Sequence, residues 1–316
     1  MFTQRLAGIC LMASGVLAMT CASQAAIIGP YTVDANTLHL WHINDSGLPV
    51  TDAPTVGTPI DLLSLGSGSG GALGATSYPG FGTAYNEAQV HETGIFAKTP
   101  ANSTADNTPT TTFWNQSTGA FTYECLVRID FDPTAVNAEF VELISMENDA
   151  GSRPFNFALN PLAATAPESY EMIFQGITSG GLVNTGTAIS IQQNHWYHAA
   201  VTYDGLASGA HLKLYWTDMG TQVSPDGSAT VANLIFSGNL TANLTGTNGG
   251  DFALGAEARN TGGNTGQWAG LIDEVRISDI ARSPDQMMFG VPEPSTIVLA
   301  SLGLMGLACV RRHRRA

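Results

Sequence analysis

Cysteine is scarce in this chain, and its placement excludes internal disulfide bonds from most of the sequence. Three of the four cysteines, Cys10, Cys21 and Cys309, lie in the first 26 or the last 26 residues. Cys125 is then the sole cysteine of residues 27–290. A segment of this length can bury a sizeable core in one domain, so we expect packing to stabilise it. Cys125 should lie inside that core as a small apolar side chain.

Basic residues are also few, with 12 Lys and Arg against 26 Asp and Glu. Five of the basic residues are Arg5 and four arginines near the C-terminus, and one of the acidic residues is Glu293. Residues 27–290 therefore carry 7 basic and 25 acidic side chains, a formal charge of −18. This sign argues against nucleic acid and anionic lipid as partners of the segment, whereas divalent cations or neutral polymers suit it.

Long stretches of helical periodicity are missing between Leu38 and Ile277. Short apolar or alternating runs are broken there by Gly, Asn, Asp and Pro, which predicts strands joined by turns. The clearest strand is Phe121–Ile129, where every second residue is apolar and should face a buried side. Further strands are predicted at Glu139–Met146, Phe155–Leu159, Tyr170–Ile177, Trp196–Tyr203, Ala210–Trp216, Val231–Phe236, Phe252–Leu254 and Trp268–Ile277. We therefore predict an all-β fold, a single antiparallel jelly-roll sandwich.

Two low-complexity segments interrupt the strand pattern. Gly66–Gly74 is rich in Gly and Ser, and Ala101–Gly119 is rich in Thr, Asn and Ser, so both are expected to be exposed loops. Near the end of the body, Ser283-Pro284-Asp285-Gln286 fits a capping box with Pro at the first helical position. One short helix should therefore close the domain.

The N-terminal residues 1–26 read as a secretory signal peptide. They contain one charge, Arg5, then an apolar stretch from Leu6 to Met19 and a small-residue ending that offers an A-x-A-like cleavage site. We expect the chain that follows to be exported.

The C-terminal residues 291–316 combine three features. Pro292-Glu293-Pro294 forces an extended backbone around one carboxylate. The uncharged run 295–310 follows, and as a helix it would cover roughly 24 Å, slightly short of a hydrocarbon core of about 30 Å. We predict a marginal transmembrane segment there. The chain then ends in a basic cluster, Arg311, Arg312, Arg314 and Arg315. Such a cluster biases the C-terminus to the cytoplasmic side.

The order of tripeptide, apolar segment and arginine cluster resembles the PEP-CTERM sorting signal. The resemblance implies processing by an exosortase-type membrane enzyme in a Gram-negative bacterium that makes extracellular polysaccharide. The protein would be anchored in the inner membrane for a time and then reach the cell surface or the medium. An ordinary anchor whose tail stays attached is the alternative, and it shares the same topology.

Three further segments, in order, resemble the laminin G-like jelly-roll domains of the concanavalin A-like lectin/glucanase fold. They are GAFTYECLVRID at 119–130, WYHAAVTYDG at 196–205 and GLIDEVRISDIARSPDQM at 270–287. With a looser match at LHLWHIND, 38–45, the resemblance spans about 37–288 and implies one domain over 27–290. One departure follows the strand LKLY, where the family has a short Asn-Gly hairpin, whereas Trp216-Thr217-Asp218-Met219-Gly220 leads into a longer polar loop.

Catalytic patterns of this fold are missing. Its glycoside hydrolases carry E-x-D-x-E or E-x-D-x-x-E on one strand, and neither occurs here. Asp273 and Glu274 are adjacent, so on a strand they should point to opposite faces and play a structural part. The pairs His39-x-x-His42 and His195-x-x-His198 are three residues apart, which also separates them across a strand and disfavours shared metal binding. We expect no enzyme activity.

Weaker signals point to ligands. Asp149, Asp226 and Asp251 lie beside Gly-rich turns and are candidate Ca²⁺ ligands, although Asp beside Gly is also common turn chemistry. Lectins stack sugar rings on exposed aromatic side chains. Trp41, Trp196 and Trp216 lie within strand patterns and should be core residues, whereas Trp114 and Trp268 lie in loop-like segments and are the candidate ligand contacts.

The sequence therefore predicts an exported binding or structural protein of the cell surface or extracellular matrix. The expected ligand is carbohydrate, with the producing cell's own polysaccharide as the first candidate. Adhesion to surface proteins, a purely structural matrix role and a glycan-degrading enzyme with an unrecognised site are the alternatives.

Overall fold

A computed structural model of the chain describes most of the residues between the two terminal segments. The described residues are 26–27, 29–54, 56–66, 71–88, 94–97, 112–131, 140–147, 154–162, 169–177, 181–205, 211–226, 229, 231–239, 251–256 and 269–290. The predicted signal peptide and the predicted sorting signal lie outside them. Ile27–Gly290 forms one compact unit.

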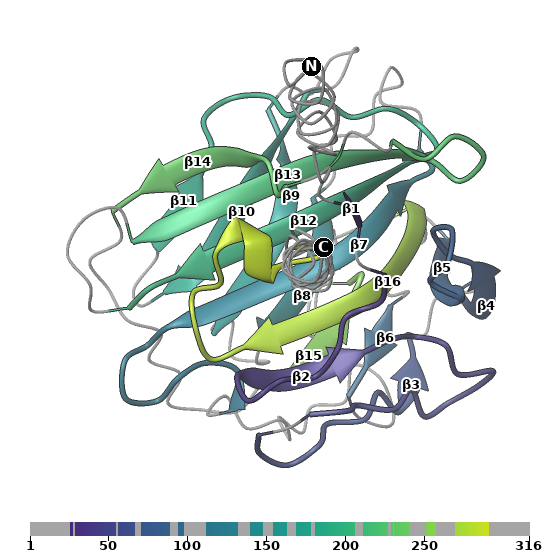
Figure 1. The fold of residues 1–316 in the computed structure, drawn as a ribbon, viewed down its shortest axis with the longest axis horizontal. Coiled ribbons are helices and arrows are strands. Elements are labelled where there is room, and N and C mark those ends of the chain that lie inside the picture. The colour runs from purple at the N-terminus through teal and green to yellow at the C-terminus, as the bar shows by residue number, and fades with distance from the viewer. Residues whose placement is uncertain are drawn as a thin grey trace, which may run out of the picture. The chain divides into compact units, whose positions relative to one another are not determined.

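Two large antiparallel sheets form most of this unit, so the predicted all-β sandwich is confirmed (Figure 1). The eight-stranded sheet consists of β14 (Leu234–Gly238), β13 (Leu212–Thr221), β12 (His195–Tyr203), β7 (Phe121–Ile129), β16 (Ala269–Ser278), β5 (Thr83–Ala88) and β4 (Ala72–Thr76), with β2 (Thr37–Trp41) paired to β16. The seven-stranded sheet consists of β11 (Gly181–Asn184), β10 (Tyr170–Ile177), β9 (Phe155–Pro161), β8 (Val141–Glu147), β15 (Asp251–Leu254), β6 (Ile95–Phe96) and β3 (Ser64–Leu65). Two short strands, β1 (Ala26–Ile27) and β17 (Phe289–Gly290), form a further sheet.

The main core lies between the two large sheets. Alternate residues of β7, from Phe121 through Cys125 to Ile129, pack there against side chains of β8, β9 and β10. Aromatic rings dominate the contact, with Tyr123 and Phe155 at 4.9 Å between ring centroids. Cys125 is a free thiol and is fully buried, as the sequence predicted. A core of this size removes the need for a disulfide.

The opposite face of the eight-stranded sheet is also covered. Leu126, Trp196 and Tyr215 point to that side and form a second apolar cluster with Tyr31 and the segment Met287–Phe289. The chain before β2 and the chain after β16 therefore lie over the outer face, and β7 is buried on both sides. The sequence predicted one buried face for β7, but both faces are buried, because the segments around Tyr31 and Met287–Phe289 cover the outer face.

Several predicted boundaries are confirmed. β7 and β10 have the predicted bounds, and the closing segment is a 3₁₀ helix, Pro284–Gln286, in which the Ser283 N–H donates to Gln286 Oε1 at 3.1 Å. The predicted strand Ala210–Trp216 ends too early. Residues 217–220 continue β13, because β12 extends far enough to pair Ala199 with Trp216 and Tyr197 with Asp218.

The two predicted low-complexity loops also need correction. β4 begins at Ala72, inside the Gly-rich run, because Ala72 and Leu73 pair with β5. In the Thr-rich segment, Phe113 and Trp114 are buried at 0% and 5% exposure. His39 contacts this segment: its Nε2 lies 3.1 Å from the Thr112 carbonyl oxygen, and its ring packs on Phe113. Among the described residues, no helix has the length and apolar character needed to cross a membrane. The predicted anchor 295–310 is not among them.

Candidate functional site

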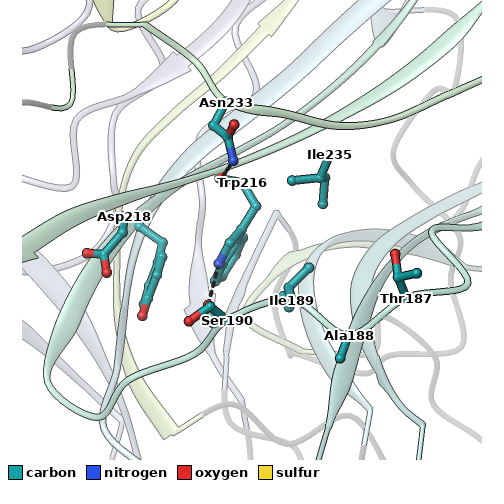
Figure 2. Close-up of a pocket in the computed structure, with 9 residues that line it drawn as sticks. Thr187, Ala188, Ile189, Ser190, Trp216, Asp218, Asn233 and Ile235 are labelled. Atoms are coloured by element: carbon teal, nitrogen blue, oxygen red, sulfur yellow. Dashed lines mark hydrogen bonds between the residues drawn. The ribbon is translucent and has the colours of Figure 1, made fainter.

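A groove opens where the inner face of the eight-stranded sheet meets the chain that follows β11 (Figure 2). Its volume is about 330 Å³, at the lower end of the range for small-molecule sites. It is lined by Thr187, Ala188, Ile189, Ser190, Tyr197, Trp216, Asp218, Asn233 and Ile235. We call it the aromatic groove.

Two stacked rings make the floor of the aromatic groove. Trp216 of β13 and Tyr197 of β12 lie 4.5 Å apart between centroids, with 16° between their planes. The Trp216 Nε1–H donates to the Ser190 carbonyl oxygen at 3.0 Å, which ties the indole to one wall. Trp216 is 4% exposed, so it presents a small part of its surface at the bottom of the groove. The pair is rigidly held and apolar.

The two walls come from segments on either side of this floor. On one side, residues 187–190 are fixed by the bridge between Ile189 and Tyr170 of β10. On the other side, Asn233 and Ile235 belong to the chain that enters β14, and Figure 2 shows both across the indole from Ser190. The Asn233 N–H donates to Thr217 Oγ1 at 2.8 Å. Both walls are therefore attached to strands, which preorganises the groove.

Unused hydrogen-bonding capacity collects on these walls. The Asn233 amide donates one Nδ2–H to the Trp216 carbonyl oxygen at 3.1 Å, while its Oδ1 has no partner in the described chain. The Ser190 hydroxyl also has no partner there. Both residues are exposed. An amide and a hydroxyl can each donate and accept, so the groove offers both kinds of group to a ligand.

Asp218 lies at one end of the groove and carries its negative charge. Its Oδ1 accepts the Gly220 N–H at 2.8 Å and lies 3.0 Å from His195 Nδ1, and its Oδ2 accepts from Gln192 Nε2 at 3.3 Å. Burial and the Asp218 charge both raise the pKa of Tyr197. The Tyr197 hydroxyl accepts the Gln192 N–H at 2.7 Å and, being neutral, keeps its own proton for donation.

The ligand contacts predicted from the sequence, Trp114 and Trp268, are not among the described residues that line the aromatic groove. Trp216 was predicted as a core residue, and it is, but it also lines the groove. Trp114 was expected to be exposed, and at 5% exposure that expectation is wrong, because the Thr-rich segment packs into the core. Trp268 lies outside the described residues. The polar residues Thr217 and Asp218 after Trp216 were the available signal, but the predicted strand ended at Trp216 and did not include them.

The candidate calcium ligands are not brought together in the described chain. Asp149 and the side chain of Asp251 lie outside it, although the Asp251 backbone pairs with Glu147. Asp226 lies after β13 of the other sheet, and its N–H donates to the Met219 carbonyl oxygen. Within the described residues, no group of three or more His, Cys, Asp or Glu side chains has the arrangement of a metal site. Calcium binding stays a prediction.

A second polar cluster lies on the outer face of the same sheet and is buried. Glu124 Oε1 accepts from Arg276 Nε at 2.7 Å, and Glu124 Oε2 accepts from the Tyr31 hydroxyl at 2.8 Å and lies 3.2 Å from His198 Nε2. We call these four residues the buried network. Burial by itself would raise the pKa of Glu124, but the charge of Arg276 and the bonds from His198 and Tyr31 outweigh it and lower the pKa to about 2.

The adjacent carboxylates Asp273 and Glu274 serve the same structural purpose. Glu274 accepts the Tyr31 backbone N–H at 2.8 Å and contacts His42 Nδ1 at 2.7 Å, whereas Asp273 is bonded by the Ser77 hydroxyl. The register of β16 against β7 shifts between Asp273 and Arg276. The contacts of Glu274 hold Tyr31 and His42 against the outer face of the sheet.

The four histidines of the two H-x-x-H pairs contact different carboxylates. His39 Nδ1 lies 2.6 Å from Asp52, and His42 lies near Glu274. His195 contacts Asp218 in the aromatic groove, while His198 belongs to the buried network. Each histidine thus has its own acceptor.

Comparison with known proteins identifies the C-terminal segment. Residues 290–315 match the family described as the PEP-CTERM protein-sorting motif. The motif indicates an exported, cell-surface protein of a Gram-negative bacterium and implies processing by an exosortase-type enzyme. No curated protein matches the chain.

Solved structures resemble the chain distantly. The binding domain of botulinum neurotoxin serotype D/C is 12% identical, with a TM-score of 0.47 over 80% of this chain and 51% of that one. A sialidase from Trypanosoma rangeli in complex with sialic acid is 13% identical, with a TM-score of 0.43 over 89% and 38%. The CBM40 domain of a Ruminococcus gnavus sialidase, bound to sialyllactose, is 12% identical, with a TM-score of 0.36 over 54% and 80%. This chain therefore spans about half of the neurotoxin domain and less than half of the Trypanosoma enzyme. Similarity at this level carries no argument about ligand or activity, and the laminin G-like resemblance stays a prediction.

Proposed function

We propose that the exported body binds carbohydrate in the aromatic groove and catalyses no reaction on it. The observation that carries the proposal is the combination of a fixed aromatic floor with unused polar groups on the walls. Trp216 and Tyr197 supply the floor, and Asn233 Oδ1 and the Ser190 hydroxyl have no partner in the described chain.

Sugar units have the matching chemistry. A pyranose ring has apolar C–H faces that pack on aromatic surface, and its rim carries hydroxyls that both donate and accept. Asn233 and Ser190 offer donors and acceptors around the rings, and Asp218 offers an acceptor at one end. A stable protein interface needs on the order of 800 Å² from each partner, which is far more than this groove supplies. Carbohydrate therefore fits the groove better than a protein surface does.

The single carboxylate of the groove supports binding without catalysis. Glycoside hydrolases use two carboxyl groups, roughly 5 to 10 Å apart, as acid and as base or nucleophile. Among the described residues that line the groove, Asp218 alone has a carboxyl group. Both of its oxygens already accept hydrogen bonds from Gly220 or Gln192. A groove of this kind can hold a sugar, but it lacks the second group that hydrolysis requires.

The cellular setting supplies a candidate ligand. The PEP-CTERM motif is consistent with an exported, cell-surface protein. The acidic body, with 25 acidic and 7 basic residues between the two ends, favours a neutral polymer over an anionic one. The extracellular polysaccharide of the producing cell is the first polymer to test. Protein adhesion and a structural role in the matrix are the other outcomes that the experiment distinguishes.

The test is titration calorimetry of the exported protein against that polysaccharide, with calcium and then with a chelator. We expect saturable binding that weakens at least tenfold in Asn233→Ala, because truncation removes both the free acceptor and the free N–H. Asn239→Ala is the matched control, since Asn239 is exposed, lies at the end of β14 and does not line the groove.

Three outcomes would contradict the proposal. Binding that is equal in Asn233→Ala and Asn239→Ala would place the ligand elsewhere. No heat in either condition would favour protein partners or a passive matrix role. Release of reducing sugars by the purified protein would show an enzyme. Loss of binding with the chelator alone would add calcium to the site and direct attention to Asp149, Asp226 and Asp251.

A further inference from the structure

A second pocket opens several strands away in the eight-stranded sheet, between the start of β2, the end of β16 and the segment around Trp114. Its volume is about 350 Å³, similar to that of the aromatic groove. The lining that matters is Leu38, Val56, Trp114, Gln116 and Asp279. We call it the Trp114 pocket.

Polar groups of the Trp114 pocket lack partners. Asp279 Oδ1 is buried and accepts no hydrogen bond. The indole N–H of Trp114 donates to no group of the described chain, whereas the indoles of Trp41 and Trp216 donate to the carbonyl oxygens of Ile60 and Ser190. A carboxylate oxygen without a partner is unusual in a folded protein and calls for an explanation. An acceptor and a donor left free beside one pocket are the pattern expected of a binding site.

The walls of the pocket are apolar and fixed. Leu38 and the half-exposed Val56 supply aliphatic surface next to the Trp114 ring. The Asn115 carbonyl oxygen accepts the Gly119 N–H at 2.7 Å, and Asn115 Oδ1 accepts the Ser117 N–H at 3.0 Å. Gln116 donates its Nε2–H to the Trp114 carbonyl oxygen at 3.1 Å, which leaves its Oε1 as an acceptor at the rim. The loop is therefore shaped before any ligand arrives.

The two pockets are well separated. Trp216 lies on β13 and Leu38 on β2, and the order β13, β12, β7, β16, β2 places four strand spacings between them. At about 4.8 Å per spacing, the lateral distance is roughly 19 Å. One sugar unit cannot occupy both pockets, so a protein with both sites can hold two units of one chain or two different chains.

We propose that the Trp114 pocket binds a second neutral saccharide unit, so that the body is bivalent and cross-links polysaccharide chains. A sugar hydroxyl donates to the free Asp279 oxygen, a second sugar oxygen accepts the Trp114 N–H, and the C–H face of the ring packs on Leu38 and Val56. Cross-linking gains from two sites, because once one pocket is occupied the second binds at a high effective concentration. This inference shares its ligand class with the proposed function and rests on it to that extent.

The experiment counts binding sites. An oligosaccharide fraction of the producing cell's polysaccharide, short enough to fill one pocket, is titrated into the exported protein, Asn233→Ala and Asp279→Asn. We expect two sites per chain in the parent and one in each variant. The intact polymer should form turbid, cross-linked complexes with the parent, and the turbidity should fall at least tenfold with either variant. Asp279→Asn preserves shape and replaces one carboxylate oxygen by an NH₂ group, which cannot accept a hydrogen bond from a sugar hydroxyl.

Every outcome separates this inference from the proposed function. One site in the parent that Asn233→Ala removes and Asp279→Asn leaves intact would overturn the Trp114 pocket and keep the aromatic groove. One site that only Asp279→Asn removes would do the reverse. No binding overturns both. If Asp279→Asn fails to fold, Val56→Ser replaces it, because Val56 is 39% exposed and its change leaves the core intact.

Discussion

Tyr197 and His198 are neighbours in β12, yet they belong to two polar clusters of opposite character. Tyr197 points to the inner face and lines the aromatic groove, where Asn233 and Ser190 keep unused donors and acceptors. His198 points to the outer face and joins the buried network, where both oxygens of Glu124 are bonded. Charged groups that are buried and paired hold the fold together, whereas polar groups left unpaired beside water are available to a ligand. We therefore expect the outer face of the sheet to serve stability and the inner face to serve the proposed binding.

The strongest test of this contrast is Arg276→Met. The change removes the cation that contacts Glu124 at 2.7 Å and leaves the carboxylate buried without its charge partner. We expect the free energy of unfolding to fall by about 3–5 kcal/mol in urea titrations, with glycan affinity unchanged in the protein that stays folded. Lys213→Met is the matched control, because Lys213 lies on β13 and makes no ion pair in the described chain; it should cost less than about 0.5 kcal/mol. An equal loss of unfolding free energy in Arg276→Met and Lys213→Met would show that the buried network does not contribute more to stability than an ordinary position on the sheet.

Acid should weaken the buried network without a mutation. The pKa of Glu124 falls from 4.5 to about 2 on folding, so its contribution is complete above pH 4.5 and is lost as the pH falls toward 2. The difference corresponds to roughly 3 kcal/mol. Glu124→Gln has no proton to bind at this position, so the gap in unfolding free energy between parent and variant should narrow as the pH falls from 4.5 to 2. A gap that stays constant over this range would show that the Glu124 charge does not stabilise the fold.

The smallest expected effect is that of Trp216→Phe. The variant keeps a ring on the groove floor but loses the N–H that donates to the Ser190 carbonyl oxygen. We expect a loss of about 1 kcal/mol in stability and a few-fold loss in glycan affinity, because the wall 187–190 is no longer tied to the floor. Trp196→Phe is a useful comparison, since the Trp196 indole N–H has no partner to lose and the residue does not line the groove. An affinity loss of equal size in Trp196→Phe would mean that the effect is not local to the groove.

Much of the strand pattern could be predicted because period-two alternation and turn residues act over short distances. The predicted bounds of β7 and β10 match to the residue, and the capping box at Ser283 predicts the 3₁₀ helix that follows it. The incorrect predictions concern residues whose conformation or burial depends on contacts with a segment far away in the sequence. The strand predicted to end at Trp216 continues to Thr221, because β12 pairs with the additional residues. Trp114 looks exposed and is buried because His39, on β2, contacts the carbonyl oxygen of Thr112.

The candidate sites show the same limit more sharply. Trp216, Asn233 and Ser190 come from three segments with no common motif, and only the pairing of β12 with β13 and the docking of residues 187–190 on β10 bring them together. Residue type does not reveal which hydrogen-bonding groups are free. Asp218 and Asp279 are both aspartates, yet Asp218 Oδ1 accepts the Gly220 N–H and Asp279 Oδ1 accepts no hydrogen bond.

The sorting motif and the fold class of this protein can both be recognised from its amino-acid sequence. A PEP-CTERM motif is a local signal, and an all-β pattern repeats along the chain, so neither needs contacts between distant residues to be recognised. The tertiary structure alone decided which polar groups are bonded and which are free. That distinction depends on where loops and strands far apart in sequence meet, because a hydrogen bond is a property of two positioned groups.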